Sequence, residues 1–464
     1  MTDTEKTTDI LDPQEARRQR MITEPLLPLL IRTAIPTMIG MLVAMIYNLT
    51  DTFWVARLDN TAMTAAVGVV FSFFTLTQAL GFWFGYGSGN TMSRLLGGGN
   101  RKEAEIISST GIVLAVVLGT LLMVLCLIFL RPLAGLIGGS ASEELMSFTV
   151  SYLRIIVIVI PFSLYATTLY NQFRLCGNVK DGMTGLAAGM ITNIVIDPVL
   201  ILVFHMGVTG AGLATLIGQV LSCVLLTSLS FKNGNIPVTI RKFSLKNRRW
   251  YHICMGGAPN FCRQGITSLA SVLLNNVAVP YGTDTIAALT IAGRVAMLVY
   301  SLMIGFGQGF QPICAMNYGA KKYDRVNKVL KMTVGTGTAF MILGAVVIYI
   351  FAKPLIGIFS TEQAVVEAGV RILRYQCFAL PFLAVYAISS MYMQNIGMYW
   401  RALVISVSRQ GLFYIPALYI LTGSLGILGI YIVQPVADVL SFGMALAIVA
   451  ASAGKTHLKE TESY

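Results

Sequence analysis

The sequence predicts an all-α polytopic membrane protein, and its composition and the grouping of its apolar residues carry that prediction. The chain has 464 residues, of which 55% are hydrophobic and only 12% charged, and its mean hydropathy is +0.72. A soluble domain usually carries about 25% charged residues. The apolar residues also gather in long runs, close to the ~20 residues that cross a bilayer as a helix. These features exclude a water-soluble globular protein, a disordered chain and a coiled coil.

Twelve membrane-spanning helices are expected from these runs, each ended by charged residues, glycine or proline. An even number of spans places both termini on one side of the membrane. The expected spans cover residues 26–50, 62–92, 104–130, 147–172, 182–205, 209–231, 250–279, 285–311, 328–352, 367–394, 401–422 and 427–451.

The basic residues fix the expected orientation. The net charge is +12, from 33 Lys and Arg against 21 Asp and Glu. Of the basic residues, 23 fall on the side of the termini and only three on the other side, namely Arg57, Arg131 and Lys353. Cytoplasmic loops of membrane proteins carry such an excess. We therefore expect a multi-pass protein of the cell membrane with both termini cytoplasmic, and no nucleic-acid partner.

An internal repeat divides the chain into two halves of six spans. Five ordered matches keep an offset of 220 to 223 residues: 99–102 with 319–322, Pro132 with Pro354, 153–154 with 373–374, 161–162 with 381–382, and Pro36 with Pro259. Parallel repeats of this kind occur in transporters whose substrate binds between the halves. The expected parts are an N-terminal cytoplasmic tail (1–24), an N-lobe (25–231), a basic linker (232–249), a C-lobe (250–452) and a C-terminal tail (453–464).

Two carboxylates, Asp197 and Asp438, lie well inside the expected spans, and a third, Asp51, lies at the outer end of the first span. An ionisable group in the membrane costs about 2.5–3.5 kcal/mol and marks function by default. The repeat places Leu274 opposite Asp51 and Ile415 opposite Asp197. A role in packing a six-helix lobe should recur in the other lobe, so the acidic site is expected in the N-terminal half alone.

Oxygen-bearing residues surround Asp197 in the sequence. Asn193 lies four residues earlier and shares its helix face, and Ala211 and Thr215 are likewise four apart in the next span. Pro198 supplies no backbone donor and can free a carbonyl oxygen nearby. This set suits Na⁺, or a carboxylate that binds a proton. The alternative is a hydrogen-bonded network that only packs helices.

The remaining polar residues are weaker candidates. We expect Asp438 to form a structural ion pair with Arg409, with Arg294 as the other possible cation and a second coupling site as the other role. Pro36 and Pro198 are expected to act as conformational hinges. No CxxC or Cys/His cluster occurs, so the seven cysteines are interpreted as small buried hydrophobes rather than disulfides or ligands. The roles of Arg263 and Arg294 stay open.

The chain resembles the multidrug and toxic compound extrusion (MATE) family. The resemblance rests on the twelve spans in two halves, on the segment 47–57 with its Asp51, which follows Pro36 by fifteen residues, and on the motif Asn193-x-x-x-Asp197-Pro198. The Gly-rich stretch 97–102, its repeat 319–322 and Gln434-Pro-x-x-x-Asp438 look most like the MepA-type branch.

The resemblance implies a V-shaped pair of lobes that rock to export organic cations in exchange for Na⁺ or H⁺. It implies that the coupling ion binds Asp51, Asn193, Asp197, Thr215 and the carbonyl of Ala211. In another branch the coupling carboxylates lie on the first and fourth helices of the C-lobe. The corresponding helices here carry no acid in their membrane-spanning parts, so that kind of C-lobe site is not expected.

The leading hypothesis is therefore a secondary active exporter of small-molecule drugs or toxic organic cations, monomeric in the bilayer, with no cofactor besides its coupling ion. A lipid-linked saccharide flippase of the same superfamily is the alternative, kept open by Arg263, Arg294 and Arg409. An enzyme is not expected, because no nucleophile with a base and no metal cluster occurs at membrane depth. A receptor gives no reason for the repeat, and the loop at 94–102 lacks the motif of a major-facilitator antiporter.

Overall fold

The computed structural model describes residues 12–58, 60–232 and 234–453, leaving aside the side chains of residues 48, 49, 51, 52 and 453. Every regular element in this part of the chain is helical. The α-helices are α1 (Pro13–Thr23), α2 (Leu26–Ala56), α3 (Thr61–Gly97), α4 (Arg101–Ile128), α5 (Leu130–Leu136), α6 (Glu143–Leu175), α7 (Val179–Pro198), α8 (Gly207–Ser230), α9 (Arg249–Ala278), α10 (Thr283–Gly319), α11 (Tyr323–Ile350), α12 (Ala352–Gly357), α13 (Gln363–Asn395), α14 (Tyr399–Val407), α15 (Ile415–Leu425) and α16 (Ile427–Ala453). The 3₁₀ turns are η1 (Gly139–Ala141), η3 (Ile240–Lys242) and η4 (Val279–Tyr281), and the π-helical segments are η2 (Val199–Val203) and η5 (Ser408–Tyr414).

Eleven helices in the described residues are long and apolar enough to cross a membrane, and they coincide with eleven of the twelve expected spans. The twelfth expected span, 250–279, forms α9, which has 30 residues. At 1.5 Å per residue this helix is about 45 Å long, enough to cross a bilayer. It is less apolar than the others because it carries Asn260, Arg263 and Gln264. The fold is thus the expected all-α membrane architecture.

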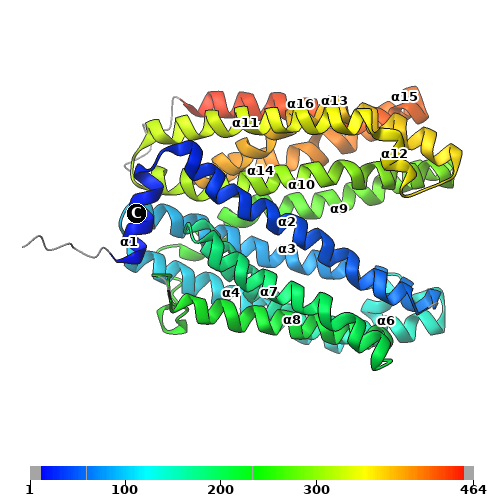
Figure 1. The fold of residues 1–464 in the computed structure, drawn as a ribbon, viewed down its shortest axis with the longest axis horizontal. Coiled ribbons are helices and arrows are strands. Elements are labelled where there is room, and N and C mark those ends of the chain that lie inside the picture. The colour runs from blue at the N-terminus through cyan, green and yellow to red at the C-terminus, as the bar shows by residue number, and fades with distance from the viewer. Residues whose placement is uncertain (1–11, 59, 233, 454–464) are drawn as a thin grey trace, which may run out of the picture.

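The internal repeat appears in the helix lengths. Both α3 and α10 have 37 residues, α4 and α11 have 28, and α6 and α13 have 33. Gly177 and Gly397 follow α6 and α13 and share a φ of +82°, which favours glycine. We call α2–α8 the N-lobe and α9–α16 the C-lobe. In Figure 1 the C-lobe helices form the upper group and most of the N-lobe the lower group, while α2 runs diagonally from upper left to lower right.

The two lobes meet at the end of the molecule that carries α1, here called the terminal end. At this end α3 and α10 pack through a reciprocal glycine contact. A Cβ on Gly97 would lie 2.2 Å from the Met316 carbonyl oxygen, and a Cβ on Gly319 would lie 1.9 Å from that of Arg94. Gly97 and Gly319, like Arg94 and Met316, are 222 residues apart, so the repeat makes the contact symmetric. No side chain larger than glycine fits without moving the helices apart.

A second close approach joins α3 to α9. A Cβ on Gly87 would lie 1.8 Å from the Ile253 carbonyl oxygen, and one on Gly257 would lie 1.8 Å from the Trp83 carbonyl oxygen. The Trp83 indole donates a hydrogen bond to the Cys254 carbonyl at 2.6 Å. Together with the α3–α10 contact, these residues form what we call the inter-lobe seam.

Candidate ion-coupling site and inter-lobe seam

The structure brings Asn193, Asp197 and Thr215 together inside the N-lobe. Asp197 is fully buried, and the other two side chains are each 1% exposed. The Asn193 Nδ2 donates to Asp197 Oδ1 and to Thr215 Oγ1, both at 3.4 Å. The site therefore joins α7 to α8 through an amide that contacts both a carboxylate and a hydroxyl.

Glycines on α7 and α8 make this approach possible. A Cβ on Gly189 would lie 2.3 Å from the Gly218 carbonyl oxygen, and one on Gly218 would lie 3.2 Å from the Asn193 Cβ. The α7 face that carries Gly189 also carries Asn193 and Asp197 at steps of four residues, which places all three against α8. Ala211, four residues before Thr215, is fully buried in the same helix.

The helix changes its winding directly after Asp197. Pro198 ends α7, and the next five residues, Val199–Val203, form a π-helical segment. The Phe204 N–H donates to the Val199 carbonyl at 3.0 Å, the i+5 spacing of that winding. Proline cannot donate the usual bond, and single π turns are common at functional sites. The Pro198 expected as a hinge thus lies at a real break in helix geometry, and its role in motion stays a prediction.

One polar atom of the site has no partner among the described residues. Asn193 Oδ1 is buried and accepts no hydrogen bond from them. Buried amide oxygens are normally satisfied, and an exception calls for a bound ion, a water or a missing group. Carboxylate, amide and hydroxyl oxygens are hard ligands of the kind that Na⁺ takes. The chemistry of the site therefore fits the expected coupling ion. The backbone of Asp51 belongs to α2, but the structure does not describe its side chain.

Pro36 lies in the part of α2 that docks on the C-lobe. The Thr33 hydroxyl donates to the Gly309 carbonyl at 2.9 Å, and the Thr37 hydroxyl donates to the Gly305 carbonyl at 2.7 Å. Both threonines are buried. Pro36 therefore stands between the two residues that fasten α2 to α10.

Two buried arginines cross the seam, and neither was singled out from the sequence, where both count as loop residues. The Arg174 Nη1 donates to the Gln308 carbonyl at 2.9 Å and to Gln311 Oε1 at 2.8 Å. The Arg94 guanidinium donates to the Asn395 carbonyl at 3.1 Å and to the Tyr399 hydroxyl at 2.7 Å. Arg174 is fully buried. Arg94 closes the carbonyl-rich C-terminal end of α13, where a cation is favoured, whereas Arg174 binds the interior of α10.

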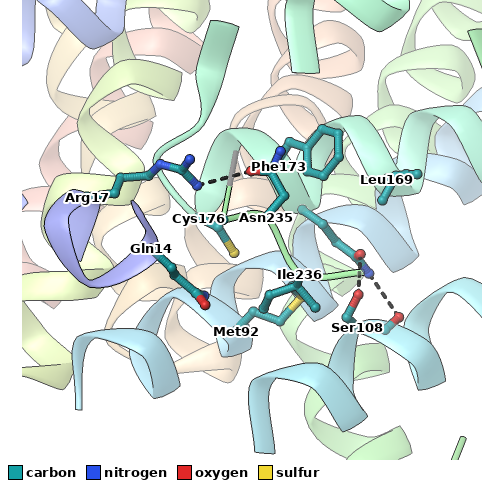
Figure 2. Close-up of a pocket in the computed structure, with 11 residues that line it drawn as sticks. Gln14, Arg17, Met92, Ser108, Leu169, Phe173, Cys176, Asn235 and Ile236 are labelled. Atoms are coloured by element: carbon teal, nitrogen blue, oxygen red, sulfur yellow. Dashed lines mark hydrogen bonds between the residues drawn. The ribbon is translucent and has the colours of Figure 1, made fainter. Parts of the chain in front are cut away.

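The first helix, α1, ties both lobes together at the terminal end. The Arg18 Nε donates to the Gly97 carbonyl of the N-lobe at 3.0 Å, and the C-lobe residue Asn317 donates to the Met21 carbonyl at 2.9 Å. Figure 2 shows Arg17 of α1, which donates to Asn235 Oδ1 of the linker at 3.1 Å beside a narrow pocket. This pocket contains none of the residues around Asp197, so it is a joint between α1 and the N-lobe.

The C-lobe holds its own buried ion pair. The Arg409 Nε donates to Asp438 Oδ1 at 2.7 Å, and the Gln434 amide donates to the same oxygen at 2.7 Å. The Arg409 guanidinium also lies over the Tyr300 ring, 5.0 Å from its centroid. Arg409 belongs to η5, the π-helical segment that precedes Pro416. The pairing is the one expected from the sequence, while its structural role stays a prediction.

Comparison with known proteins places the chain in a family. The MatE family model matches residues 36–199 and 259–420, one block in each lobe. The chain belongs to the MatE family. It is a membrane transporter rather than an enzyme, as expected from the sequence.

Individual relatives agree with this assignment. The chain is 26% identical over 426 residues to the multidrug export protein MepA of Staphylococcus aureus strain N315, with 92% of this chain and 94% of the relative covered. It is 26% identical over 417 residues to MepA of Staphylococcus saprophyticus, with 90% and 92% covered. A solved structure titled as the outward-facing conformation of a multidrug resistance MATE transporter matches with a TM-score of 0.87 at 24% identity, covering 96% of this chain and 99% of that chain.

In this MatE protein, the acid Asp197 of the N-lobe has no acidic counterpart at the equivalent position of the C-lobe. The N-lobe holds Asp197 on α7, whereas the described membrane-spanning part of the equivalent C-lobe segment holds Ile415 at that position. All seven cysteines are free thiols, and three of them, Cys176, Cys314 and Cys377, are buried as expected, whereas the other four are partly exposed.

Proposed function

We propose that this MatE protein is a secondary active multidrug exporter that moves organic cations out of the cell in exchange for Na⁺ or H⁺. The observation that carries the proposal is the fully buried Asp197, which contacts Asn193 within a lobe that is otherwise largely apolar. The similarity to MepA multidrug export proteins supports the choice of cargo.

The exchange follows from the cost of an unneutralised charge. A buried carboxylate is expensive unless a cation or a proton neutralises it. We assign Asp197, Asn193, Thr215 and the Ala211 carbonyl to the coupling ion, with Asp51 as the second carboxylate. The empty, negative site and the loaded, neutral site then favour different helix packing next to Pro198. An organic cation competes with the ion for the same negative potential, which is the requirement for antiport.

Helix α2 is the proposed mechanical link between this site and the seam. Its outer part carries Asp51, and its terminal part is fastened to α10 by Thr33 and Thr37. A change in the charge of the site would alter how α2 packs on α7 and so whether Thr33 and Thr37 can hold α10. Pro36, between these threonines, is the proposed hinge.

The orientation is part of the proposal. The excess of basic residues on the terminal side supports cytoplasmic termini. Hydrogen bonds between the two lobes made by Trp83, Arg94 and Arg174 lie in the half of the spanning helices nearer the terminal end. The described arrangement is then closed to the cytoplasm. We further propose that the transporter acts as a monomer.

Ethidium efflux from vesicles tests the proposal. One set of vesicles receives only a Na⁺ gradient and another only a pH gradient, so each candidate ion is examined alone. We expect at least one gradient to drive ethidium uphill, and Asp197→Asn to abolish that export while the protein still folds. Uphill export at the wild-type rate by both Asp197→Asn and Asp51→Asn would show that the N-lobe acids are not the coupling centre.

A further inference from the structure

Two arginines inside the spanning helices of the C-lobe, Arg263 and Arg409, are half-buried, and of these two only Arg409 has a carboxylate partner among the described residues. Arg409 is neutralised by Asp438 at 2.7 Å. Arg263 on α9 lies beside α13, because its hydrogen-bond partner Asn260 is itself bonded to the buried Gln394 of that helix. The described residues place no carboxylate within ion-pairing distance of Arg263, whose one hydrogen bond among them is a long 3.5 Å contact to Asn260 Oδ1.

The neighbours of Arg263 are already engaged with one another. The Asn260 amide donates to Gln394 Oε1 at 3.2 Å, and the Gln394 amide donates to the Gly256 carbonyl at 2.6 Å. This chain of bonds turns the Asn260 oxygen toward Arg263 and leaves most guanidinium donors without an acceptor among the described residues.

The position of Arg263 on α9 points it toward the space between the lobes. Gly256 lies on the face of α9 that meets α3, since a Cβ there would lie 3.2 Å from the Gly87 Cα. Arg263 follows Gly256 by seven residues, two turns of helix, so it continues the same face beyond the seam. Its side chain is half-buried rather than sealed in the core.

The repeat shows that this charge is not needed to pack a six-helix lobe. The offset of 223 that relates Pro36 to Pro259 places Gly40 of the N-lobe opposite Arg263. The N-lobe therefore has no side chain at this position, and the Met183 Cε occupies the space, 2.0 Å from where a Cβ on Gly40 would lie. The Arg263 guanidinium therefore has no equivalent in the N-lobe.

We propose that Arg263 forms an anion subsite in the C-lobe that binds a carboxylate carried by the exported compound. Guanidinium and carboxylate match as planar, bidentate partners, and such a pair gains strength away from water. This inference rests on the proposed function and narrows its cargo. The transported class then includes amphoteric organic cations, whose positive part is drawn to the acidic N-lobe and whose carboxylate docks at Arg263.

Two rhodamine dyes that differ only in a free or a methyl-esterified benzoate test the subsite. Their binding to the purified protein is measured by fluorescence anisotropy, and their export is measured in vesicles. We expect Arg263→Gln to weaken binding of the free acid by about ten-fold and to leave the ester within about two-fold. Arg263→Lys should recover part of the loss, because it keeps the charge but not the planar fork.

Arg294→Gln is the matched control. Arg294 also belongs to the C-lobe, on α10, and it is exposed and has no contact with the Arg263 cluster in the described residues. Its removal should lower affinity for both dyes alike or for neither. An equal effect of Arg263→Gln on acid and ester, or no effect on either, would overturn the subsite. Failure of wild-type vesicles to export the ester would instead count against the proposed function, while the anisotropy of the free acid would still decide the role of Arg263.

Discussion

Gly319→Ala is predicted to weaken the closed arrangement of the terminal end. The added Cβ would lie 1.9 Å from the Arg94 carbonyl oxygen, whereas an ordinary van der Waals contact is ~3.5 Å. The two backbones must therefore separate locally by about 1.6 Å, the difference between these values. Overpacking of this kind costs about 1–3 kcal/mol. Only the closed arrangement bears that cost, so the equilibrium should move toward an open terminal end by about 5- to 150-fold.

Spin-label distance measurements across the terminal end can detect this shift. Labels at Lys102 on α4 and Lys328 on α11 place one probe on each lobe at exposed positions, in a background without the native cysteines. The distance distribution of Gly319→Ala should gain a longer component. Gly443→Ala is the control, because no atom lies within 4 Å of its added Cβ. An unchanged distribution together with full transport in Gly319→Ala would refute the idea that this glycine sets the seam.

Three further predictions concern single sites. Asp438→Asn should reduce the amount of folded protein measured by fluorescence-detected size exclusion, since removing one partner of a buried ion pair costs ~3–5 kcal/mol. Replacing Arg409 by glutamine as well should restore part of the folded protein. Normal folding with lost coupling would contradict a structural role for Asp438. Burial beneath α1 raises the pKa of the Cys176 thiol to about 12, so the neutral thiol should stabilise the fold fully below its ordinary pKa of 9.0 and progressively less as pH rises toward 12. Maleimide labelling of Cys176 at pH ~8 should be slow, because the thiolate is the reactive form, and it should be faster in Arg18→Ala. Equal labelling rates would argue against α1 as a cover of this thiol. Thr215→Val should raise the Na⁺ concentration for half-maximal transport by about ten-fold and leave any H⁺-driven transport intact, whereas an unchanged Na⁺ dependence would remove Thr215 from the site.

The sequence predicts the helices well because hydropathy and helix breaks are local properties. All twelve expected spans appear as helices, and the offsets of the repeat agree with the matched lengths of α3 and α10. The association of Asn193 with Asp197 was also predictable, since a spacing of four fixes a shared helix face. Contact of this pair with Thr215 depends on the glycine packing of α7 against α8, which no single spacing specifies.

The parts that sequence reasoning missed are those decided by contact between the lobes. Residues 13–23 fall in the expected polar tail but form α1, whose start is marked by the Asp12 cap and Pro13 and whose Met21 and Ile22 are buried. Arg174 was counted among loop residues because it follows an apolar run. Its burial comes from α10 of the other lobe, more than a hundred residues away. Charge patterning gives the side of the membrane, and it does not reveal which basic residues a partner lobe will cover.

Reciprocal exchange tests the central claim most directly. Proteoliposomes with purified protein are loaded with ²²Na⁺ or with a pH indicator, and an outside gradient of ethidium is the only driving force. The account predicts that the dye gradient moves Na⁺ or H⁺ in the opposite direction in the wild type, and that Asp197→Asn abolishes this counterflow while still folding. Ion counterflow that persists in Asp197→Asn at the wild-type rate would contradict an N-lobe coupling site at that carboxylate.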